Sequence, residues 1–267
     1  MISTAIILAG GFGTRLRKAV PNLPKPMVNI NNRPFLEHQM DYWIDQGIKK
    51  FILSVGYLNE IIINHFGHSY KGISLEYVVE ESPLGTGGGL LNATKNLTET
   101  FLVLNGDTFI ELDLNKIFEF HSKNNSIWTF ALFKTDEVDR YMLMNIGLKG
   151  QIYSLNSHQS FKTGLANGGV YLIEPSALNL LDFVIGESAS LEEQLLPNLI
   201  SNGGKIFGFE CQGKFIDIGT LFKFNLYESF CLFKCFSKSA IKPSDISIDV
   251  LAKVNNLLLN FKCKFGK

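Results

Sequence analysis

Apolar and polar residues alternate with two different periods over the first half of the chain. Short apolar runs, which we expect to form strands, are separated by stretches whose apolar positions recur at helical spacing. The expected strands cover residues 4–9, 50–55, 74–79 and 101–105, and the expected helices cover residues 35–46, 59–65, 88–95 and 114–123. Asn59 is expected to cap the second of these helices. Strands that alternate with helices form a mostly parallel sheet with helices on both faces, so the pattern predicts an α/β fold.

The pattern changes after residue 127. Strand-like runs follow with few helical stretches between them, and we interpret them as antiparallel strands added to the sheet. They are expected at residues 127–134, 146–156 and 169–173, followed by a helix at 191–201 and strands at 205–210 and 214–218. Residues 1–230 are therefore expected to form one domain with a mixed sheet.

The tail from about residue 231 differs from the rest of the chain. It contains seven lysines against two aspartates, and one helix face would be lined by Val250, Leu251, Val254, Leu257, Leu258 and Phe261. We interpret residues 231–267 as a C-terminal appendage of unknown role. A helix docked on the core, a helix that binds a membrane surface or a partner, and a poorly ordered or non-native terminus all fit this composition.

Composition and charge narrow the class of protein. The 267 residues are 46% hydrophobic and 19% charged with a formal net charge of zero, which fits a globular protein and gives no indication of nucleic acid as a partner. No apolar run reaches the length that spans a bilayer, and the N-terminus lacks the pattern of a signal peptide. The four cysteines lie in the last quarter without a C-x-x-C pair, so we expect free thiols in a reducing cytoplasm.

A glycine-rich loop follows the first expected strand, in the sequence Leu8-Ala9-Gly10-Gly11-Phe12-Gly13-Thr14-Arg15-Leu16. Glycines at the carboxyl end of a strand let backbone N–H groups approach phosphate oxygens, and Arg15 can add a bidentate contact. The loop lacks the third glycine of the dinucleotide-binding fingerprint and the Gly-Lys-Ser/Thr end of a Walker loop. It therefore indicates another kind of phosphate site, although a tight turn with an incidental arginine would show the same residues.

A second cation follows in Leu23-Pro24-Lys25-Pro26-Met27. Two prolines restrict the backbone around Lys25 and would hold its ammonium group in one place at low entropic cost. Alone, this segment is compatible with a plain loop. Next to a glycine-rich loop that carries an arginine, it indicates a second phosphate contact.

Together, Gly-Gly-x-Gly-Thr-Arg-Leu at residues 10–16 and Leu-Pro-Lys-Pro at residues 23–26 resemble the signature of the sugar-1-phosphate nucleotidyltransferases. The resemblance extends over about residues 3–225 and implies a Rossmann-like fold with an added antiparallel region that binds the sugar. The family usually has an Arg-Pro pair after the loop leucine, where this chain has Arg17 and Lys18. The short catalytic chain and the segment 83–88 look most like the branch that transfers GMP to D-glycero-D-manno-heptose 1-phosphate.

The resemblance implies which residues contact the nucleotide and the metal. The implied nucleotide contacts are Leu8, Ala9, Gly10, Gly11, Gly13 and Thr14 of the first loop, Gly85 and Thr86 of a second glycine loop that meets the base and ribose, and Gly106. Asp107, which ends an apolar strand, and Asp217 match the family's two Mg²⁺ ligands. An aspartate at the end of a strand is also a common turn former, so Asp107 alone would not indicate a metal.

The resemblance also implies a sugar site. Asn167 and Gly168 match the strand that carries an asparagine toward the sugar. The segment 190–193 matches one that positions a glutamate near the sugar hydroxyls, with Glu192 favoured over Glu193. Many relatives have a Glu-Lys pair before the asparagine, with the lysine on the sugar phosphate. That pair is absent here, and Lys162 is the remaining candidate for this contact.

The implied reaction is in-line attack of a sugar 1-phosphate on the α-phosphorus of a nucleoside triphosphate, with release of pyrophosphate. A phosphate monoester is already an anion, with a second pKa of about 6, so a strong general base is unnecessary. Catalysis would consist of positioning and electrostatic stabilisation. Arg15 would hold the β- and γ-phosphates, Lys25 would lie near the reacting phosphates, and Mg²⁺ on the two aspartates would bridge both substrates.

GTP is the expected nucleotide, and the nucleotide-sugar would serve surface polysaccharide synthesis. A hexose-1-phosphate thymidylyl-, cytidylyl- or uridylyltransferase is the nearest alternative. A catalytically inactive relative that binds nucleotide-sugar as a regulatory subunit is another. An NAD-dependent enzyme is disfavoured by the missing third glycine. The sequence leaves the oligomeric state open, including a homo-oligomer.

Overall fold

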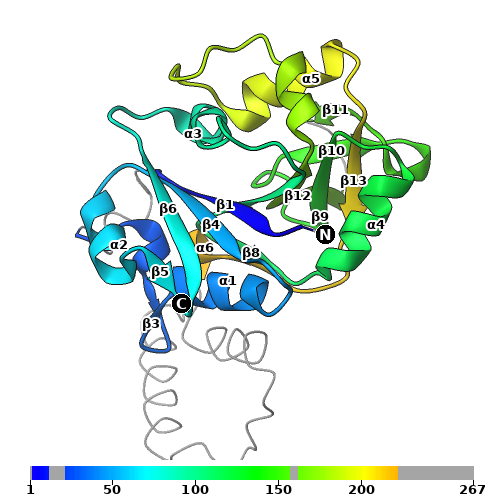
Figure 1. The fold of residues 1–267 in the computed structure, drawn as a ribbon. Coiled ribbons are helices and arrows are strands. Elements are labelled where there is room, and N and C mark those ends of the chain that lie inside the picture. The colour runs from blue at the N-terminus through cyan, green and yellow to red at the C-terminus, as the bar shows by residue number, and fades with distance from the viewer. Residues whose placement is uncertain (1, 12–21, 157–161, 222–267) are drawn as a thin grey trace, which may run out of the picture. The chain divides into compact units, whose positions relative to one another are not determined.

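A computed structural model describes residues 2–11, 22–156 and 162–221 of the chain. The described residues up to Gly219 belong to one compact unit that contains the sheet and its helices (Figure 1). The appendage predicted at residues 231–267 lies outside the described residues, as do Gly13, Thr14 and Arg15 of the first glycine loop.

Four neighbouring parallel strands form the centre of a ten-stranded sheet. They stand in the order β7 (Phe101–Asn105), β1 (Thr4–Ala9), β4 (Lys50–Val55) and β6 (Ile73–Val79). Ile6 of β1 pairs with Val103 on one side and with Ile52 on the other, so apolar residues meet across the strands. These strands confirm the predicted parallel sheet, and their carboxyl ends lie along one edge.

Side chains of β1 alternate between two apolar cores, one on each face of the sheet. The helices that cover the two faces are α1 (Phe35–Ile44), α2 (Asn59–Phe66), α3 (Gly85–Ala93), α4 (Leu114–Lys123) and α5 (Leu196–Ser201). Ala5, Ile7 and Ala9 pack with α1, α2 and α4, whereas Ile6 packs with α3 and α5. Figure 1 shows α1 and α2 on one side of the parallel strands and α3 on the other, which confirms the predicted helices on both faces.

Two predicted helix starts differ from the structure. Asn59 is not the cap of α2, because Leu58 occupies that position with a φ of 55°. Asn59 is itself helical, and its side-chain amide donates to the Gly56 carbonyl at 2.9 Å. α3 begins at Gly85 rather than near residue 88, so part of the second glycine loop forms its first turn.

An antiparallel region extends the sheet beyond β7. β12 (Gly164–Ile173) pairs antiparallel with β7, with β9 (Trp128–Thr135) and with β10 (Leu143–Ile146). β10 also pairs with β11 (Ile152–Asn156), and β13 (Ile206–Glu210) runs parallel to β9. The single strand predicted over residues 146–156 is wrong, because Lys149 and Gly150, with φ of 68° and 88°, lie in a turn between two strands.

Two small sheets and several short helices complete the described chain. β14 (Phe215–Asp217) pairs with β8 (Thr108–Ile110), β2 (Asn29–Ile30) pairs with β3 (Arg33–Pro34), and β5 (Ser69–Tyr70) borders β6. The short helices are η1 (Lys25–Met27), η2 (Leu148–Gly150), η3 (Pro175–Leu180), η4 (Leu191–Leu195) and α6 (Ile218–Leu221). η4 is a π-helical turn that leads into α5, which confirms the helix predicted over residues 191–201.

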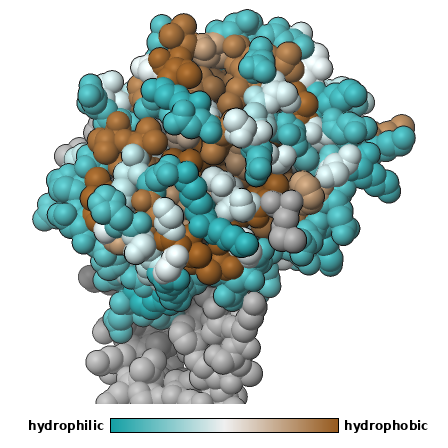
Figure 2. All heavy atoms as spheres, in the orientation of Figure 1, coloured by the Kyte–Doolittle hydropathy of each residue, from teal (hydrophilic) through white to brown (hydrophobic). Residues whose placement is uncertain are grey.

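The drawn face, the described helices and the described cysteine can each be checked against the expectations from composition. On the face drawn in Figure 2, hydrophilic residues are interspersed with separate apolar patches. Among the described helices, none has both the length and the apolar character needed to cross a bilayer. Cys211, the cysteine that falls within the described residues, is buried and has a free thiol.

Candidate active site

Four glycines crowd the carboxyl edge of the parallel strands. Gly10 follows β1, Gly56 follows β4 and Gly106 follows β7, while Gly89 lies in α3. A Cβ atom added to Gly56 would stand 2.8 Å from the Gly10 carbonyl oxygen, and one added to Gly106 would stand 2.8 Å from the Leu8 carbonyl oxygen. Side chains have no room at these positions, so backbone groups themselves line this edge.

The described part of the predicted nucleotide loop lies at this edge. Leu8 and Ala9 end β1, and the Gly106 N–H donates to the Leu8 carbonyl at 2.9 Å. Gly11 is exposed, and a Cβ atom added to it would meet nothing within 4 Å. The structure therefore gathers Gly10, Gly11 and Gly106 where a ligand can approach the ends of β1 and β7.

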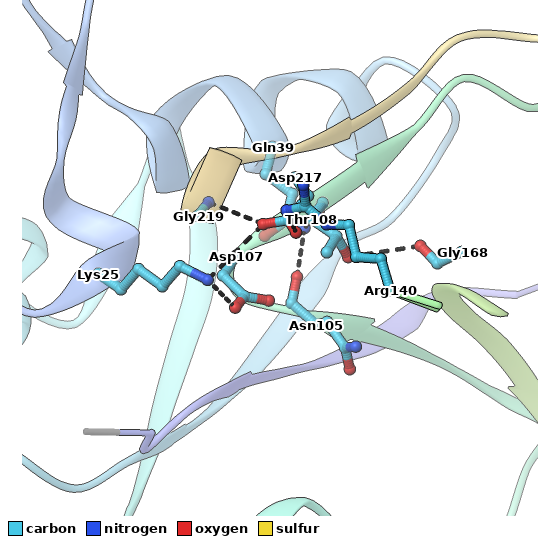
Figure 3. Close-up of polar contacts among 9 residues, drawn as sticks. All are labelled: Lys25, Gln39, Asn105, Asp107, Thr108, Arg140, Gly168, Asp217 and Gly219. Carbon is cyan, nitrogen blue, oxygen red and sulfur yellow. Dashed lines mark hydrogen bonds and ion pairs between the residues drawn. The ribbon is translucent and has the colours of Figure 1, made fainter. Parts of the chain in front are cut away.

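Figure 3 shows two carboxylates and an ammonium group that meet directly after Gly106, one of these glycines. Lys25 Nζ donates to Asp107 Oδ2 and lies 3.8 Å from Asp217 Oδ1. The side chains of Lys25 and Asp217 are 17% and 15% exposed, whereas that of Asp107 is 38% exposed. The structure thus brings together three of the four residues that the sequence assigned to the reaction centre, and the fourth, Arg15, lies outside the described residues.

Backbone contacts set the positions of the two carboxylates. Asp217 is the last residue of β14 and pairs with Thr108 of β8, the residue after Asp107. The Ile218 N–H donates to the Asp107 carbonyl at 3.1 Å, and the Gly219 N–H donates to Asp217 Oδ1 at 2.7 Å. Pairing between segments far apart in the chain therefore determines how close the carboxylates lie.

Gln39 of α1, which the sequence analysis missed, holds the turn that carries Asp107. Its Nε2 donates to the carbonyl oxygens of Asn105 and Thr108, both at 2.9 Å, and the side chain is buried (Figure 3). A hydrogen bond of this kind contributes about 0.5–1.5 kcal/mol, so the two bonds of Gln39 stabilise the turn. Gln39 lies among the apolar residues of a helix, and no local pattern marked it as part of a site.

Arg140, in the segment between β9 and β10, is a second residue that the sequence analysis missed. Its Nη2 donates to Asp217 Oδ2 at 3.0 Å, and its Nη1 lies 3.3 Å from Glu137 Oε2. Asp217 therefore faces Lys25 with one carboxylate oxygen and Arg140 with the other. The segment around Arg140 is polar and without periodicity, so nothing local indicated that it reaches a residue 77 positions away.

An aromatic cluster joins the segment of Arg140 to the strand of Asp217. The rings of Phe133 and Phe215 are stacked, and Tyr141 packs edge-on against both, with centroids 5.1 and 5.6 Å away. Burial, and then the nearby negative charge of Asp217, raise the pKa of Tyr141 to about 12. The Tyr141 hydroxyl therefore stays protonated at neutral pH, while its ring anchors the loop.

The second glycine loop meets the predicted sugar-binding segment. Gly85 has a φ of +69°, and a Cβ atom there would stand 2.7 Å from the Ala189 carbonyl oxygen, so only glycine fits. Thr86 Oγ1 accepts from the Leu191 N–H at 3.0 Å and donates to Glu192 Oε2 at 3.3 Å. A residue expected to contact the nucleotide, Thr86, therefore touches one expected to contact the sugar.

Asn167 approaches the same glutamate from β12. Its Nδ2 donates to the Tyr171 hydroxyl at 2.8 Å and to Glu192 Oε1 at 3.4 Å. Burial is the main cause that raises the pKa of Glu192. The structure therefore places the two predicted sugar-binding side chains in contact.

The two other predicted sugar-binding residues differ in their surroundings. The Gly168 carbonyl accepts from Thr108 Oγ1 at 3.4 Å, which links β12 to the turn after Asp107 (Figure 3). Lys162 is exposed just before β12, and no polar contact within the described part of the chain joins it to Asn167. Within the described residues, the structure thus brings Gly168 into contact with the site but shows no such contact for Lys162.

Glu80, directly after β6, is a third residue that the sequence analysis missed. Its Oε1 accepts from Ser54 Oγ at 2.9 Å, and its Oε2 accepts from the Leu84 N–H at 3.1 Å. A Cβ atom added to Gly10 would stand 2.3 Å from Oε1, and one added to Gly89 would stand 2.8 Å from it. The carboxylate therefore lies between the first glycine loop and α3, with acceptor capacity left on each oxygen.

Comparison with known proteins identifies the family. The family model described as nucleotidyl transferase matches residues 4–230. The chain belongs to the nucleotidyl transferase family. Membership in this family confirms the resemblance that the two loop motifs carry.

Proteins of this kind from two bacteria are similar to the chain over most of its length. It is 40% identical to the D-glycero-alpha-D-manno-heptose 1-phosphate guanylyltransferase of Campylobacter jejuni, over 80% of this chain and 94% of the relative. It is 39% identical to the protein of the same name from Aneurinibacillus thermoaerophilus, over 80% and 92% of the two chains. The crystal structure of HddC from Yersinia pseudotuberculosis complexed with GMP-PN is 32% identical, with a TM-score of 0.73 over 88% of this chain and all (100%) of that one.

The carboxylate pair of this nucleotidyl transferase suits a divalent cation. Mg²⁺ prefers oxygen ligands and is commonly held by one or two carboxylates together with substrate phosphates. Within residues 2–11, 22–156 and 162–221, no group of three or more His, Cys, Asp or Glu side chains could hold a metal by itself. Asp107 and Asp217 nevertheless converge on one positive group, the Lys25 ammonium, so the pair fits a cation whose other ligands come from substrates.

Proposed function

We propose that this nucleotidyl transferase transfers GMP from GTP to D-glycero-α-D-manno-heptose 1-phosphate and releases pyrophosphate. The names of two relatives that match 80% of the chain support the choice of sugar and base. The reaction type rests on one observation, the Lys25 ammonium between the Asp107 and Asp217 carboxylates at the carboxyl edge of the sheet. The reaction would take place in the cytoplasm, and its product would serve surface polysaccharide synthesis.

The main obstacle to this reaction is repulsion between the two substrates, which are both anions. The attacking phosphate needs no general base, because its second pKa is about 6. Lys25 offers a positive charge at the reacting phosphates, and Arg15 would hold the β- and γ-phosphates. Backbone N–H groups near Gly10, Gly11 and Gly106 would donate hydrogen bonds to the remaining phosphate oxygens at the strand ends.

Asp107 and Asp217 would hold Mg²⁺, which would supply positive charge that offsets the charge of the phosphates. Lys25 now lies between the two carboxylates and offsets part of their repulsion. With the carboxylates engaged, the Lys25 ammonium can turn to a phosphate oxygen. The prolines on either side of Lys25 restrict its backbone, so this change needs only side-chain rotation.

Glu80 supports guanosine as the nucleoside. Guanine presents two neighbouring N–H donors on one edge, and a carboxylate can accept from both. Glu80 lies beside Gly10 and α3, at the second glycine loop that is expected to meet the base. Uracil and thymine present one N–H between two carbonyl oxygens, and those oxygens would face the carboxylate unfavourably. Glu80 therefore favours GTP over UTP and dTTP.

Asn167 and Glu192 would bind the sugar hydroxyls. Their side chains meet at 3.4 Å, and Thr86 connects Glu192 to the start of α3. The carboxylate offers acceptors, and the amide offers both a donor and an acceptor, so together they suit a pair of vicinal hydroxyls.

We also propose that residues 1–230 form the catalytic domain and that residues 231–267 are an appendage. The family match, which ends at residue 230, supports this boundary. The described residues that carry the candidate site, from Leu8 to Gly219, all lie before it.

Pyrophosphate release in the presence of Mg²⁺ tests the proposed reaction. Each of GTP, dTTP, CTP, UTP and ATP is paired with heptose, mannose and glucose 1-phosphates. We expect the strongest release from GTP with D-glycero-α-D-manno-heptose 1-phosphate. If another pair gives the strongest release, the reaction type stands but that pair is the substrate pair, as for a hexose-1-phosphate thymidylyl-, cytidylyl- or uridylyltransferase. No release from any pair, with folded protein, would favour an inactive relative that binds nucleotide-sugar.

A further inference from the structure

Arg140 and Lys25 lie on the two different oxygens of the Asp217 carboxylate. Arg140 Nη2 is 3.0 Å from Oδ2, and Lys25 Nζ is 3.8 Å from Oδ1 (Figure 3). Lys25 also pairs with Asp107. Among these four side chains, the two positive and the two negative charges balance.

A divalent cation on the two carboxylates would change this balance. These four side chains together with the metal would carry a net charge of about plus two, and the basic groups would share their carboxylate partners with the metal. Such an excess of positive charge attracts phosphate oxygens. Lys25 and Arg140 would therefore become phosphate-binding groups at the same time.

The two basic groups reach the cluster from different sides. Lys25 comes from η1, near the glycine loop at the nucleotide side. Arg140 comes from the antiparallel region, between β9 and β10. Thr108, the strand partner of Asp217, donates to the carbonyl of Gly168, which follows the proposed sugar-binding asparagine. Arg140 thus belongs to the part of the protein that surrounds the sugar.

Packing holds the guanidinium group of Arg140 in place and leaves part of the side chain exposed. Its Cζ lies 5.0 Å from the centroid of the Tyr141 ring, which the aromatic cluster of Phe133 and Phe215 holds in place. The side chain remains 27% exposed. Its other ion pair, with Glu137 at 3.3 Å, is solvent-exposed and therefore weak. A planar guanidinium also matches two oxygens of one phosphate, which an ammonium group does not.

We propose that Arg140 binds the phosphate group of the sugar 1-phosphate, and that Asp217 holds Arg140 until a divalent cation engages that carboxylate. This inference rests on the proposed function, because it takes the second substrate to be a sugar 1-phosphate. It assigns to Arg140 a direct substrate contact, and it makes binding of the sugar phosphate depend on the metal.

Isothermal titration of the full chain with D-glycero-α-D-manno-heptose 1-phosphate, with and without Mg²⁺, tests the inference. We expect Arg140→Gln to raise the dissociation constant and the KM of this substrate on the order of 10- to 100-fold, as for loss of a charge-assisted contact. Arg140→Lys, which keeps the charge, should lie between wild type and Arg140→Gln. Glu137→Gln removes the other partner of Arg140 and should behave like wild type. The gain in affinity that Mg²⁺ produces in the wild type should be lost in Arg140→Gln.

A role confined to positioning Asp217 would show a different signature. In that case Arg140→Gln would weaken Mn²⁺ binding, measured by electron paramagnetic resonance, and would raise the KM of GTP as much as that of the sugar phosphate. That result would overturn the inference, as would a selective loss of sugar-phosphate affinity in Lys162→Gln with Arg140→Gln unaffected. If Arg140→Gln does not fold, the same affinities are compared between the wild type and Arg140→Lys.

Failure of the inference is distinguishable from failure of the proposed function. If the wild-type protein releases pyrophosphate and Arg140→Gln leaves the affinity for the sugar phosphate unchanged, only the inference is refuted. A wild-type protein that neither binds a sugar 1-phosphate nor releases pyrophosphate would refute the proposed function, and the inference with it.

Discussion

Replacing Glu80 by glutamine tests guanosine recognition with a minimal change of shape. Glu80→Gln exchanges one carboxylate oxygen for an NH₂ group. In the wild type both oxygens accept hydrogen bonds, from Ser54 Oγ at 2.9 Å and from the Leu84 N–H at 3.1 Å. The single oxygen of glutamine can accept from the Leu84 N–H while its NH₂ group donates to Ser54 Oγ, because a hydroxyl also accepts hydrogen bonds. Toward guanine, however, the NH₂ group would face one of the two N–H donors of the base.

The expected magnitude follows from these contacts. A hydrogen bond to a charged group contributes about 1.5–3 kcal/mol, and guanine would lose one such bond. Because about 1.4 kcal/mol corresponds to a tenfold change, kcat/KM for GTP should fall about 10- to 100-fold. Uracil offers an N–H beside a carbonyl, which complements the oxygen and NH₂ of glutamine. The preference of Glu80→Gln for GTP over UTP should therefore fall by at least about tenfold.

Pyrophosphate release with GTP, UTP and dTTP at saturating sugar 1-phosphate measures this preference. Ser54→Ala is a matched control, because it removes a partner of Glu80 but leaves both carboxylate oxygens to the base. It should preserve the preference for GTP, and thermal unfolding would check that both variants fold. Equal losses with all three nucleotides would refute base recognition by Glu80 and would leave it a role in supporting the loop before α3.

Three further predictions concern the carboxylates, the tail and pH. Asp107→Asn or Asp217→Asn should lower kcat by orders of magnitude while the unfolding temperature changes little, and near wild-type turnover in Mg²⁺ would contradict the proposed metal ligands. Truncation after residue 230 should leave steady-state activity intact if the tail is an appendage, whereas insoluble truncated protein would show that the tail completes the core. His121 is buried, and burial lowers its pKa from 6.5, so the folded protein takes up a proton less readily than the unfolded chain. The free energy of unfolding should therefore fall as the pH drops below 6.5, and His121→Gln should flatten this dependence in urea titrations; equal slopes would contradict it.

The sequence by itself determined the elements that surround the site. Successive side chains of a strand point to opposite faces, so the apolar run that contains Ile6 and Ile7 predicted a strand buried on both sides. The order of strands and helices also predicted that Gly10 and Asp107 would lie at one edge, because parallel strands share their carboxyl ends. The prediction of one continuous strand was wrong where the backbone angle φ of single residues, rather than the period of apolar positions, determines the conformation. Lys149 in the turn between β10 and β11 is such a residue.

Only the tertiary structure decided which side chains share the site with the predicted ones. Gln39, Glu80 and Arg140 are ordinary polar residues in their own segments, and no motif marks them. Gln39 reaches the turn of Asp107 because α1 packs under β7, and Arg140 reaches Asp217 because β14 pairs with β8 near the aromatic cluster. Local sequence sets conformation over a few residues, whereas the distance between two side chains far apart in the chain depends on how strands pair and helices pack. The parts of the site that follow a strand or a motif were therefore predictable, and the parts that cross between elements were not.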